Sequence, residues 1–281
     1  MGGVAICGRR SWPVTEPRAP NGPETRPLRD PAVGTRPAGI QSEAEASLNV
    51  REMFSRIAPR YDFLNHFLSF SFDRIWRRRA ALRFADILSL SGAVVMDICC
   101  GTGDLTLALE RVAKRGNGNG ARVVGSDFAL PMLTLAWEKA RQARKTIGFF
   151  AADALALPLA DRSASLVTSA FGFRNLANYR HGLAEIYRIL RSGGEAGILE
   201  FCEPRRGISA AIYRAYFTKI LPRIGGAVSG DASAYAYLPA SVMSFPQPEE
   251  LVCWMREAGF TNVRYERWTF GAVTLHRGQK P

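Results

Sequence analysis

The chain has few of the residues that build metal centres and disulfide frameworks. Its 281 residues include three histidines and five cysteines, which is an odd number. No two of the cysteines have C-x-x-C spacing, whereas zinc sites and disulfide scaffolds need regular spacing. We therefore expect no bound metal and a reducing, cytoplasmic environment. The cysteines are Cys7, Cys99, Cys100, Cys202 and Cys253.

Long apolar runs are also missing. No stretch reaches the ~18 uncharged apolar residues that a membrane-spanning helix needs, and residues 1–11 lack the apolar segment of a secretory signal. The charge, in contrast, is one-sided, with 37 Lys and Arg against 25 Asp and Glu and a formal net charge of +12. A basic surface attracts polyanions. On charge alone, nucleic acid, anionic lipid and no specific partner all stay open.

The first 45 residues differ from the rest. Residues 1–40 contain seven of the 16 prolines and almost no periodic apolar pattern. Such a segment buries too little apolar surface to offset the entropy lost on ordering. We predict a disordered Pro/Arg-rich extension over residues 1–45 and one domain over residues 46–281. A transit peptide is a weaker interpretation, because residues 1–45 also carry five acidic residues.

Within the domain, helix-like and strand-like apolar patterns alternate. This alternation predicts an α/β fold with a doubly wound parallel sheet. We expect helices at 50–67, 73–90, 104–113, 179–191 and 248–258, and strands at 93–98, 122–126, 147–151, 165–170 and 196–201.

A glycine turn carries the strongest local signal. An apolar strand runs into Gly101-Thr102-Gly103 and then into a helix, and glycines there let a ligand approach the main chain. A dinucleotide site would have a third glycine where Thr106 stands, and Asp104 at the helix start would repel a phosphate. The turn therefore predicts a nucleoside ligand with no phosphate and a positive centre, which describes S-adenosylmethionine.

Two acidic residues strengthen this interpretation. Asp127 ends the second strand, where a carboxylate can accept both ribose hydroxyls, and Asp153 follows the third strand, close to an expected adenine amino group. Either residue alone is more often a helix cap or a solvated turn residue. Together with the glycine turn, they predict a cofactor site.

At this point the chain resembles a known family, the menaquinone/ubiquinone-biosynthesis C-methyltransferases, often called UbiE/MenG. The resemblance covers about residues 50–280, and its paired Cys99-Cys100 look more like the menaquinone branch. The glycine motif is shared by many methyltransferases, whereas the blocks around 53–77 and 171–176 are far more specific. The resembling blocks are 53–77, 97–104, 171–194 and 235–278.

The resemblance implies a Rossmann-like class I methyltransferase fold with a mostly parallel seven-stranded sheet and an antiparallel C-terminal strand. It implies S-adenosylmethionine as the cofactor and conversion of demethylmenaquinol to menaquinol as the reaction. Some members of the family have Ser at the cofactor-contacting position that is Ala170 here. In this chain the serine, Ser169, comes one residue earlier, so the cofactor contact at this position departs from the family pattern. The cofactor positions are then Gly101, Thr102, Gly103, Asp127, Asp153, Ala154 and Ala170.

The resemblance also gives candidate catalytic residues. Arg174 would stabilise a forming phenolate or orient a water, since its pKa above ~12 makes it a poor base. Asn175 would hold a quinol oxygen, and Tyr61 with Asp62 would close over the ring. The ordinary alternatives are a surface salt bridge for Arg174, a turn for Asn175 and a packing role for Tyr61. Residues 206–246 would form either an amphipathic packing helix or a lid that admits a polyprenyl tail and rests on anionic lipid.

Other functions compete with this one. The acceptor could be a ubiquinone-precursor benzoquinol, another small molecule or RNA, or the fold could be a non-catalytic binding module. The chain has no base-stacking motif, so we expect no nucleic-acid partner. We expect a cytoplasmic protein with peripheral contact at the inner face of the cell membrane. Its oligomeric state stays open, and a homodimer is one possibility.

Overall fold

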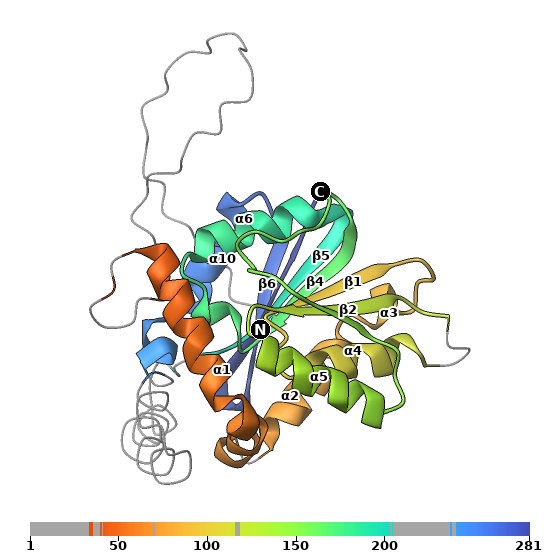
Figure 1. Ribbon diagram of the computed structural model, residues 1–281. Helices are drawn as coiled ribbons and strands as arrows, with labels where there is room; N and C mark the ends of the chain where they lie inside the picture. The colour runs from red at the N-terminus through yellow and green to blue at the C-terminus, as the bar shows by residue number, and fades with distance from the viewer. Residues whose placement is uncertain are drawn as a thin grey trace, which may run out of the picture.

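The computed structural model describes residues 34–35, 40, 42–69, 71–115, 119–202, 204, 237 and 240–281. Seven strands form one sheet in the order β3-β2-β1-β4-β5-β7-β6 (Figure 1). Strands β1 to β5 pair in parallel, and β7 runs antiparallel to both β5 and β6. This confirms the expected fold. The strands are β1 Val94–Ile98, β2 Arg122–Asp127, β3 Gly148–Ala151, β4 Ala164–Ala170, β5 Leu190–Phe201, β6 Thr261–Trp268 and β7 Val273–Gln279.

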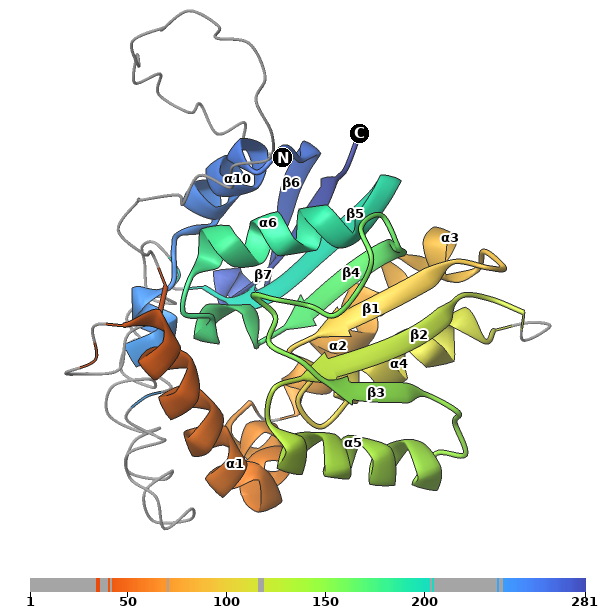
Figure 2. The same cartoon turned by 45° about the horizontal axis from the view of Figure 1, so that its top comes forward.

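Helices cover both faces of the sheet (Figure 2). One face packs against α2, α3 and α4, and the other against α6 and α10. Helix α5 lies beside β3 and α4, and α1 contacts α5 through Ala58 and Met132. The helices are α1 Glu43–Leu68, α2 Phe72–Leu82, α3 Ala85–Leu88, α4 Asp104–Ala113, α5 Leu130–Gln142, α6 Tyr179–Ile189 and α10 Pro248–Glu257, with short 3-10 helices η1 Phe173–Asn175 and η3 Thr269–Gly271.

Two predicted helices continued too far along the chain. The helix predicted over 73–90 is two helices, because Phe84 leaves helical geometry (φ −112°, ψ 18°) and buries its ring beneath the Arg277 guanidinium. The helix predicted over 179–191 ends at Ile189, because Leu190 is extended and buried and pairs with Ala164 as the first residue of β5. In both cases a long-range contact overrides local periodicity.

A few residues of the predicted N-terminal extension are described. Helix α1 begins at Glu43, seven residues before the helix start predicted at residue 50 and three before the predicted start of the domain at residue 46. Thr35 is buried, its N–H donates to the Leu176 carbonyl at 2.9 Å, and its hydroxyl donates to the Arg174 carbonyl. Residues 1–33 lie outside the described part, so disorder of the extension stays a prediction. Most of the 206–246 insertion also lies outside it.

Within the described residues, no helix has the length and hydropathy needed to cross a bilayer. The same residues contain no cluster of His, Cys, Asp and Glu side chains suited to a metal ion.

Candidate active site

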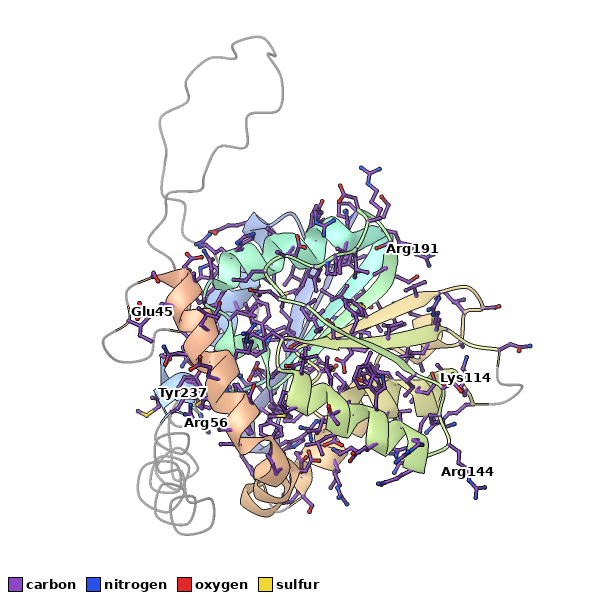
Figure 3. The ribbon with its side chains drawn as sticks, viewed as in Figure 1. Glu45, Arg56, Lys114, Arg144, Arg191 and Tyr237 are labelled. Carbon is purple, nitrogen blue, oxygen red and sulfur yellow. The ribbon has the colours of Figure 1, made fainter. Side chains whose placement is uncertain are left out.

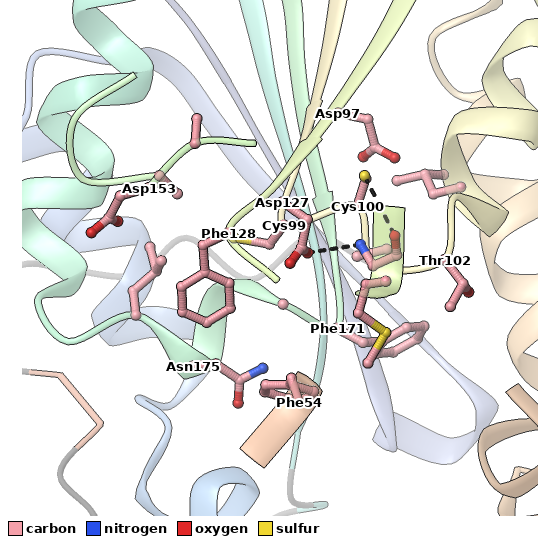
Figure 4. A pocket seen from close by; sticks show the side chains of 18 of the residues that line it. Phe54, Asp97, Cys99, Cys100, Thr102, Asp127, Phe128, Asp153, Phe171 and Asn175 are labelled. Atoms are coloured by element: carbon pink, nitrogen blue, oxygen red, sulfur yellow. Dashed lines mark hydrogen bonds between the residues drawn. The ribbon is translucent and has the colours of Figure 1, made fainter. Parts of the chain in front are cut away.

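A cavity opens at the edge where the parallel strands end (Figure 4). The space among its lining atoms measures about 840 Å³, which includes open solvent at the mouth. Among the predicted site residues, Gly103 and Arg174 do not line it. The predicted residues that line it are Tyr61, Gly101, Thr102, Asp127, Asp153, Ala154, Ala170 and Asn175.

The glycine turn forms the floor of this cavity. Gly101 and Gly103 both have positive φ (54° and 82°), a conformation that glycine adopts without steric cost. A Cβ at Gly103 would lie 3.1 Å from the Cβ of Ala136 on α5, so the glycine also permits close packing of that helix. Cys99 adopts a left-handed φ of 50° as well, which is uncommon for a residue with a side chain.

Asp127 joins the second strand to the glycine turn. Its carboxylate accepts hydrogen bonds from the N–H groups of Gly101 and Ala129, each at 2.9 Å. Burial raises the pKa of Asp127 to about 6, although these backbone hydrogen bonds oppose the shift. The carboxylate is therefore oriented, and it lies at the cavity wall.

Asp97 is a site residue that the sequence reasoning did not single out. It lies in β1, is fully buried, and lines the same cavity. Its carboxylate accepts hydrogen bonds from the hydroxyls of Thr106 (2.6 Å) and Thr168 (2.9 Å), while burial raises its pKa to about 7. The available signal was an acid inside an otherwise apolar strand, which is costly unless it is satisfied or functional.

The lining is predominantly acidic. Asp97, Asp104, Asp127 and Asp153 contribute carboxylates, and Arg77 is the basic side chain among the lining residues described. Such a lining disfavours phosphate and suits a ligand that combines hydroxyl groups with a positive centre.

Asp104 is not the bare repulsive charge that we expected. It pairs with Lys139 at 2.7 Å and lies 3.8 Å from Arg77, which itself pairs with Asp73. The sequence argument that Asp104 repels phosphate was therefore incomplete, because its two partners are distant in the sequence. The other three carboxylates carry the acidic character of the site.

Lys139 also holds α1 against the glycine turn. Its ammonium lies 2.7 Å from the Asp62 carboxylate and donates to the Thr102 hydroxyl at 2.9 Å. The Thr102 hydroxyl in turn donates to Asp62 at 2.5 Å. We expected Asp62 to close over the site, but nothing in the sequence pointed to Lys139.

Arg174 lies in η1, just beyond β4, and is buried rather than exposed. Its guanidinium pairs with the fully buried Glu200 at 3.0 Å and also donates to the carbonyl of Phe171. Burial alone would lower the pKa of Arg174, but the Glu200 charge outweighs burial and the pKa is raised. The surface salt bridge weighed as its alternative role does not fit this burial. The Arg174 Nε has no hydrogen-bond partner among the described groups.

Asn175 and Tyr61 border the mouth of the cavity. The hydroxyl of Tyr237 donates to the Asn175 Oδ1 at 3.1 Å, so a described residue of the predicted insertion reaches the site. The Tyr61 ring lies over Gly101, with its Cε1 3.8 Å from where a Cβ would be. Phe54 meets this ring edge-on, with centroids 5.9 Å apart.

Aromatic rings form one wall beside the glycine turn. Phe171 lines the cavity and stacks at a tilt on Phe201, with centroids 4.5 Å apart. The ring of Trp76 on α2 contacts both of these rings, with centroid–centroid distances of 6.0 Å to Phe171 and 6.1 Å to Phe201. Of these three rings only Phe171 is among the residues that line the cavity, and the Arg77 guanidinium lies 5.2 Å from its centroid.

Comparison with known proteins places the chain in a family. The model of the ubiE/COQ5 methyltransferase family matches residues 41–280. The chain belongs to this methyltransferase family. A demethylmenaquinone methyltransferase of Thermus thermophilus is 49% identical, covering 82% of this chain and 100% of the relative. One from Deinococcus radiodurans is 48% identical (82% and 92%), and the ubiquinone/menaquinone biosynthesis C-methyltransferase UbiE of Geotalea uraniireducens is 43% identical (84% and 98%).

Solved structures agree on the fold of this methyltransferase. A SAM-dependent methyltransferase of Thermotoga maritima superposes with a TM-score of 0.57 at 18% identity, covering 83% of this chain and 100% of that one. Another from Aquifex aeolicus gives 0.55 at 15% identity, with 78% and 98% covered. The expected class I methyltransferase fold is confirmed.

Proposed function

We propose that the protein transfers a methyl group from S-adenosylmethionine to a ring carbon of demethylmenaquinol, giving menaquinol. The observation that carries the proposal is the acidic cavity at the strand ends, in which buried Asp97 and Asp127 flank a glycine turn beside an aromatic wall. Family membership and the names of the two relatives at 49% and 48% identity support it.

The lining suits the cofactor. S-adenosylmethionine supplies a methyl group that is already activated on a sulfonium. Asp127 would accept hydrogen bonds from its ribose hydroxyls, while Gly101 and Gly103 let the backbone come close. Asp153, which accepts the Leu155 N–H at 2.9 Å, would lie at the adenine end with Ala154. Asp97 would balance the positive charge.

The acceptor would lie against the aromatic wall. A quinol carbon becomes nucleophilic when a neighbouring hydroxyl loses its proton, so a nearby cation lowers the barrier. We assign that cation to Arg174, which is buried next to the cavity-lining Asn175 and paired with Glu200, so it would act on the quinol oxygen through an ordered water. Asn175 would hold a quinol oxygen, and Tyr61 would cover the ring.

A benzoquinol precursor of ubiquinone is the second candidate acceptor. The relatives named UbiE, at 43% identity and below, carry both quinone names and support it. The paired Cys99 and Cys100 and the higher identity to the menaquinone enzymes favour demethylmenaquinol. We further propose a cytoplasmic location with peripheral contact at the inner face of the membrane, where such lipid-soluble acceptors reside.

Mass spectrometry of the quinones from a strain lacking the gene tests the substrate. We expect accumulation of the species one methyl group short of menaquinone, and restoration by the wild-type gene. An unchanged menaquinone pool would overturn the proposal. A methyl-deficient ubiquinone precursor would favour the second candidate.

A further inference from the structure

Helix α2 exposes apolar side chains along one face. Phe72, Ile75 and Leu82 are 45%, 58% and 39% exposed, and their spacing places them on one side of a 3.6-residue helix. The opposite side faces the core. Its buried residues are Asp73, Trp76, Arg77, Ala80 and Ala81.

Arginines flank this apolar line on both sides. By helical geometry, Arg74 and Arg78 lie on one flank and Arg83 on the other, while Arg79 lies between Phe72 and Ile75. All four arginines are exposed. Arg83 pairs with Glu266 and Arg79 stacks on Trp268, whereas no ion pair is recorded for Arg74 or Arg78 among the described residues. The acid of α2, Asp73, is buried, so the outward face of the helix carries positive charge alone.

A second exposed aromatic residue lies beside this helix. Phe270 in η3 is 90% exposed and has a left-handed φ of 56°. The indole N–H of Trp76 donates to the hydroxyl of Thr269 at 2.8 Å, and Phe72 stacks on Trp76 with centroids 6.0 Å apart. An uncommon backbone conformation holds this phenylalanine ring in solvent, which indicates that another molecule buries the ring.

This α2–η3 surface (residues 72–83 and 269–271) adjoins the candidate active site. Arg77 of the same helix lines the cavity, and Trp76 contacts Phe171 in its wall. The β7 residue Val273, two positions after η3, pairs with Phe201 at the carboxyl end of β5. Figure 1 shows α2 directly after α1, beside the edge at which the strands end. An apolar molecule held at this surface would therefore be close to the cavity.

We propose that the α2–η3 surface docks on a bilayer that contains anionic phospholipid. Helices that bind at a membrane interface insert apolar side chains into the bilayer surface and place flanking arginines against acidic headgroups. The inference rests on the proposed function in one respect, since a lipid-soluble acceptor explains why the docking face lies beside the cavity. The insertion over 206–246, our earlier candidate for membrane contact, is not needed for this argument.

Co-sedimentation of the full chain with vesicles tests the proposal. Wild-type protein is expected to bind vesicles of phosphatidylcholine with phosphatidylglycerol at low salt, and to bind pure phosphatidylcholine much less. The change Arg74→Glu/Arg78→Glu should weaken binding by about 25-fold or more, since each surface arginine contributes about fivefold. Ile75→Ser and Phe270→Ser should each weaken it several-fold.

Matched controls lie on the opposite edge of the sheet. Leu90 is 50% exposed, a fraction similar to that of Ile75, so Leu90→Ser should bind like wild type. The exposed Arg122 and Arg191 stand near the starts of β2 and β5, and Arg122→Glu/Arg191→Glu makes the same change of charge there. Arg191 is labelled in Figure 3. We expect a smaller loss for this pair than for Arg74→Glu/Arg78→Glu. Unchanged thermal unfolding and cofactor binding would show that every variant is folded.

Three results would overturn the docking proposal. They are no wild-type binding to anionic vesicles at low salt, surface variants that bind like wild type, and controls that lose as much as the surface variants. An assay of methyl transfer to a water-soluble short-chain quinol distinguishes failure of the docking proposal from failure of the proposed function. If that transfer occurs without any vesicle binding, only the docking surface is wrong; if it does not occur, the proposed function is wrong.

Discussion

The affinity for the cofactor should fall in acid because of Asp127. In the ligand-free protein, burial raises the pKa of this carboxyl to about 6, and its two backbone hydrogen bonds fix its orientation. Ribose hydroxyls donate better to a carboxylate than to a carboxylic acid. Protonation of Asp127 should therefore weaken binding as the pH falls below 6.

The size of the effect follows from the fraction ionised. With a pKa of about 6, Asp127 is about 97% ionised at pH 7.5 and about 9% at pH 5, so binding that requires the carboxylate weakens about tenfold. Asp97, with a pKa of about 7 in the same cavity, adds a second step at higher pH. Because the two groups share one cavity, the apparent midpoints belong to the pair.

Calorimetric titration with S-adenosylhomocysteine or S-adenosylmethionine from pH 5 to pH 8 measures this. Asp127→Asn should bind at least tenfold more weakly at pH 7.5 and should lose the step near pH 6. The matched Asp161→Asn, at an exposed carboxylate that does not line the cavity, should behave like wild type. A wild-type affinity that stays constant down to pH 5 would show that the Asp127 charge does not govern binding. An Asp127→Asn variant that keeps the step would show the same.

Three further predictions concern other parts of the site. Arg174→Ala should lower kcat by about 10²–10³ with little change in cofactor affinity, because it removes the proposed cation. It should also lose about 3–5 kcal/mol of stability, because Glu200 is left buried and unpaired, whereas Arg174→Lys keeps the charge and should lose less of both turnover and stability. Turnover and thermal unfolding measure the two effects, and normal turnover in Arg174→Ala removes Arg174 from the mechanism. Lys139→Met should release the cofactor about three- to tenfold faster by freeing α1, and an unchanged off-rate by stopped flow would count against that closure. Asp97→Asn should raise the stability of the ligand-free protein at pH 8 and not at pH 4. The pKa of Asp97 in the folded protein is raised to about 7, so the stability that its protonated form contributes is present below pH ~4 and is lost as the pH rises through 7. Equal effects of the substitution at both pH values in denaturant titrations would contradict this.

The residues that sequence could predict are those whose signal is local. The glycine turn and Asp127 follow apolar strands directly, so strand order and chain direction bring them to one edge. Asp97 carries a comparable signal, an acid in an apolar strand, but the two hydroxyl groups that satisfy it come from Thr106 and Thr168 on other elements.

The residues that sequence could not predict act through partners far along the chain. Lys139 meets Asp62 and Asp104 from a separate helix, and Glu200 pairs with Arg174 from the neighbouring strand. No periodicity marks such pairs. The end of α2 was missed for the same reason, because Phe84 turns out of the helix to reach a strand more than a hundred residues later.

The fate of the methyl group is the sharpest test of the proposed reaction. Purified protein would be incubated with methyl-labelled S-adenosylmethionine and demethylmenaquinol, with total RNA in a parallel reaction, and the labelled product would be fragmented by mass spectrometry. We predict that the label appears on a ring carbon of menaquinol and not in RNA. Label on a quinol oxygen, or no transfer to the quinol at all, would contradict the account.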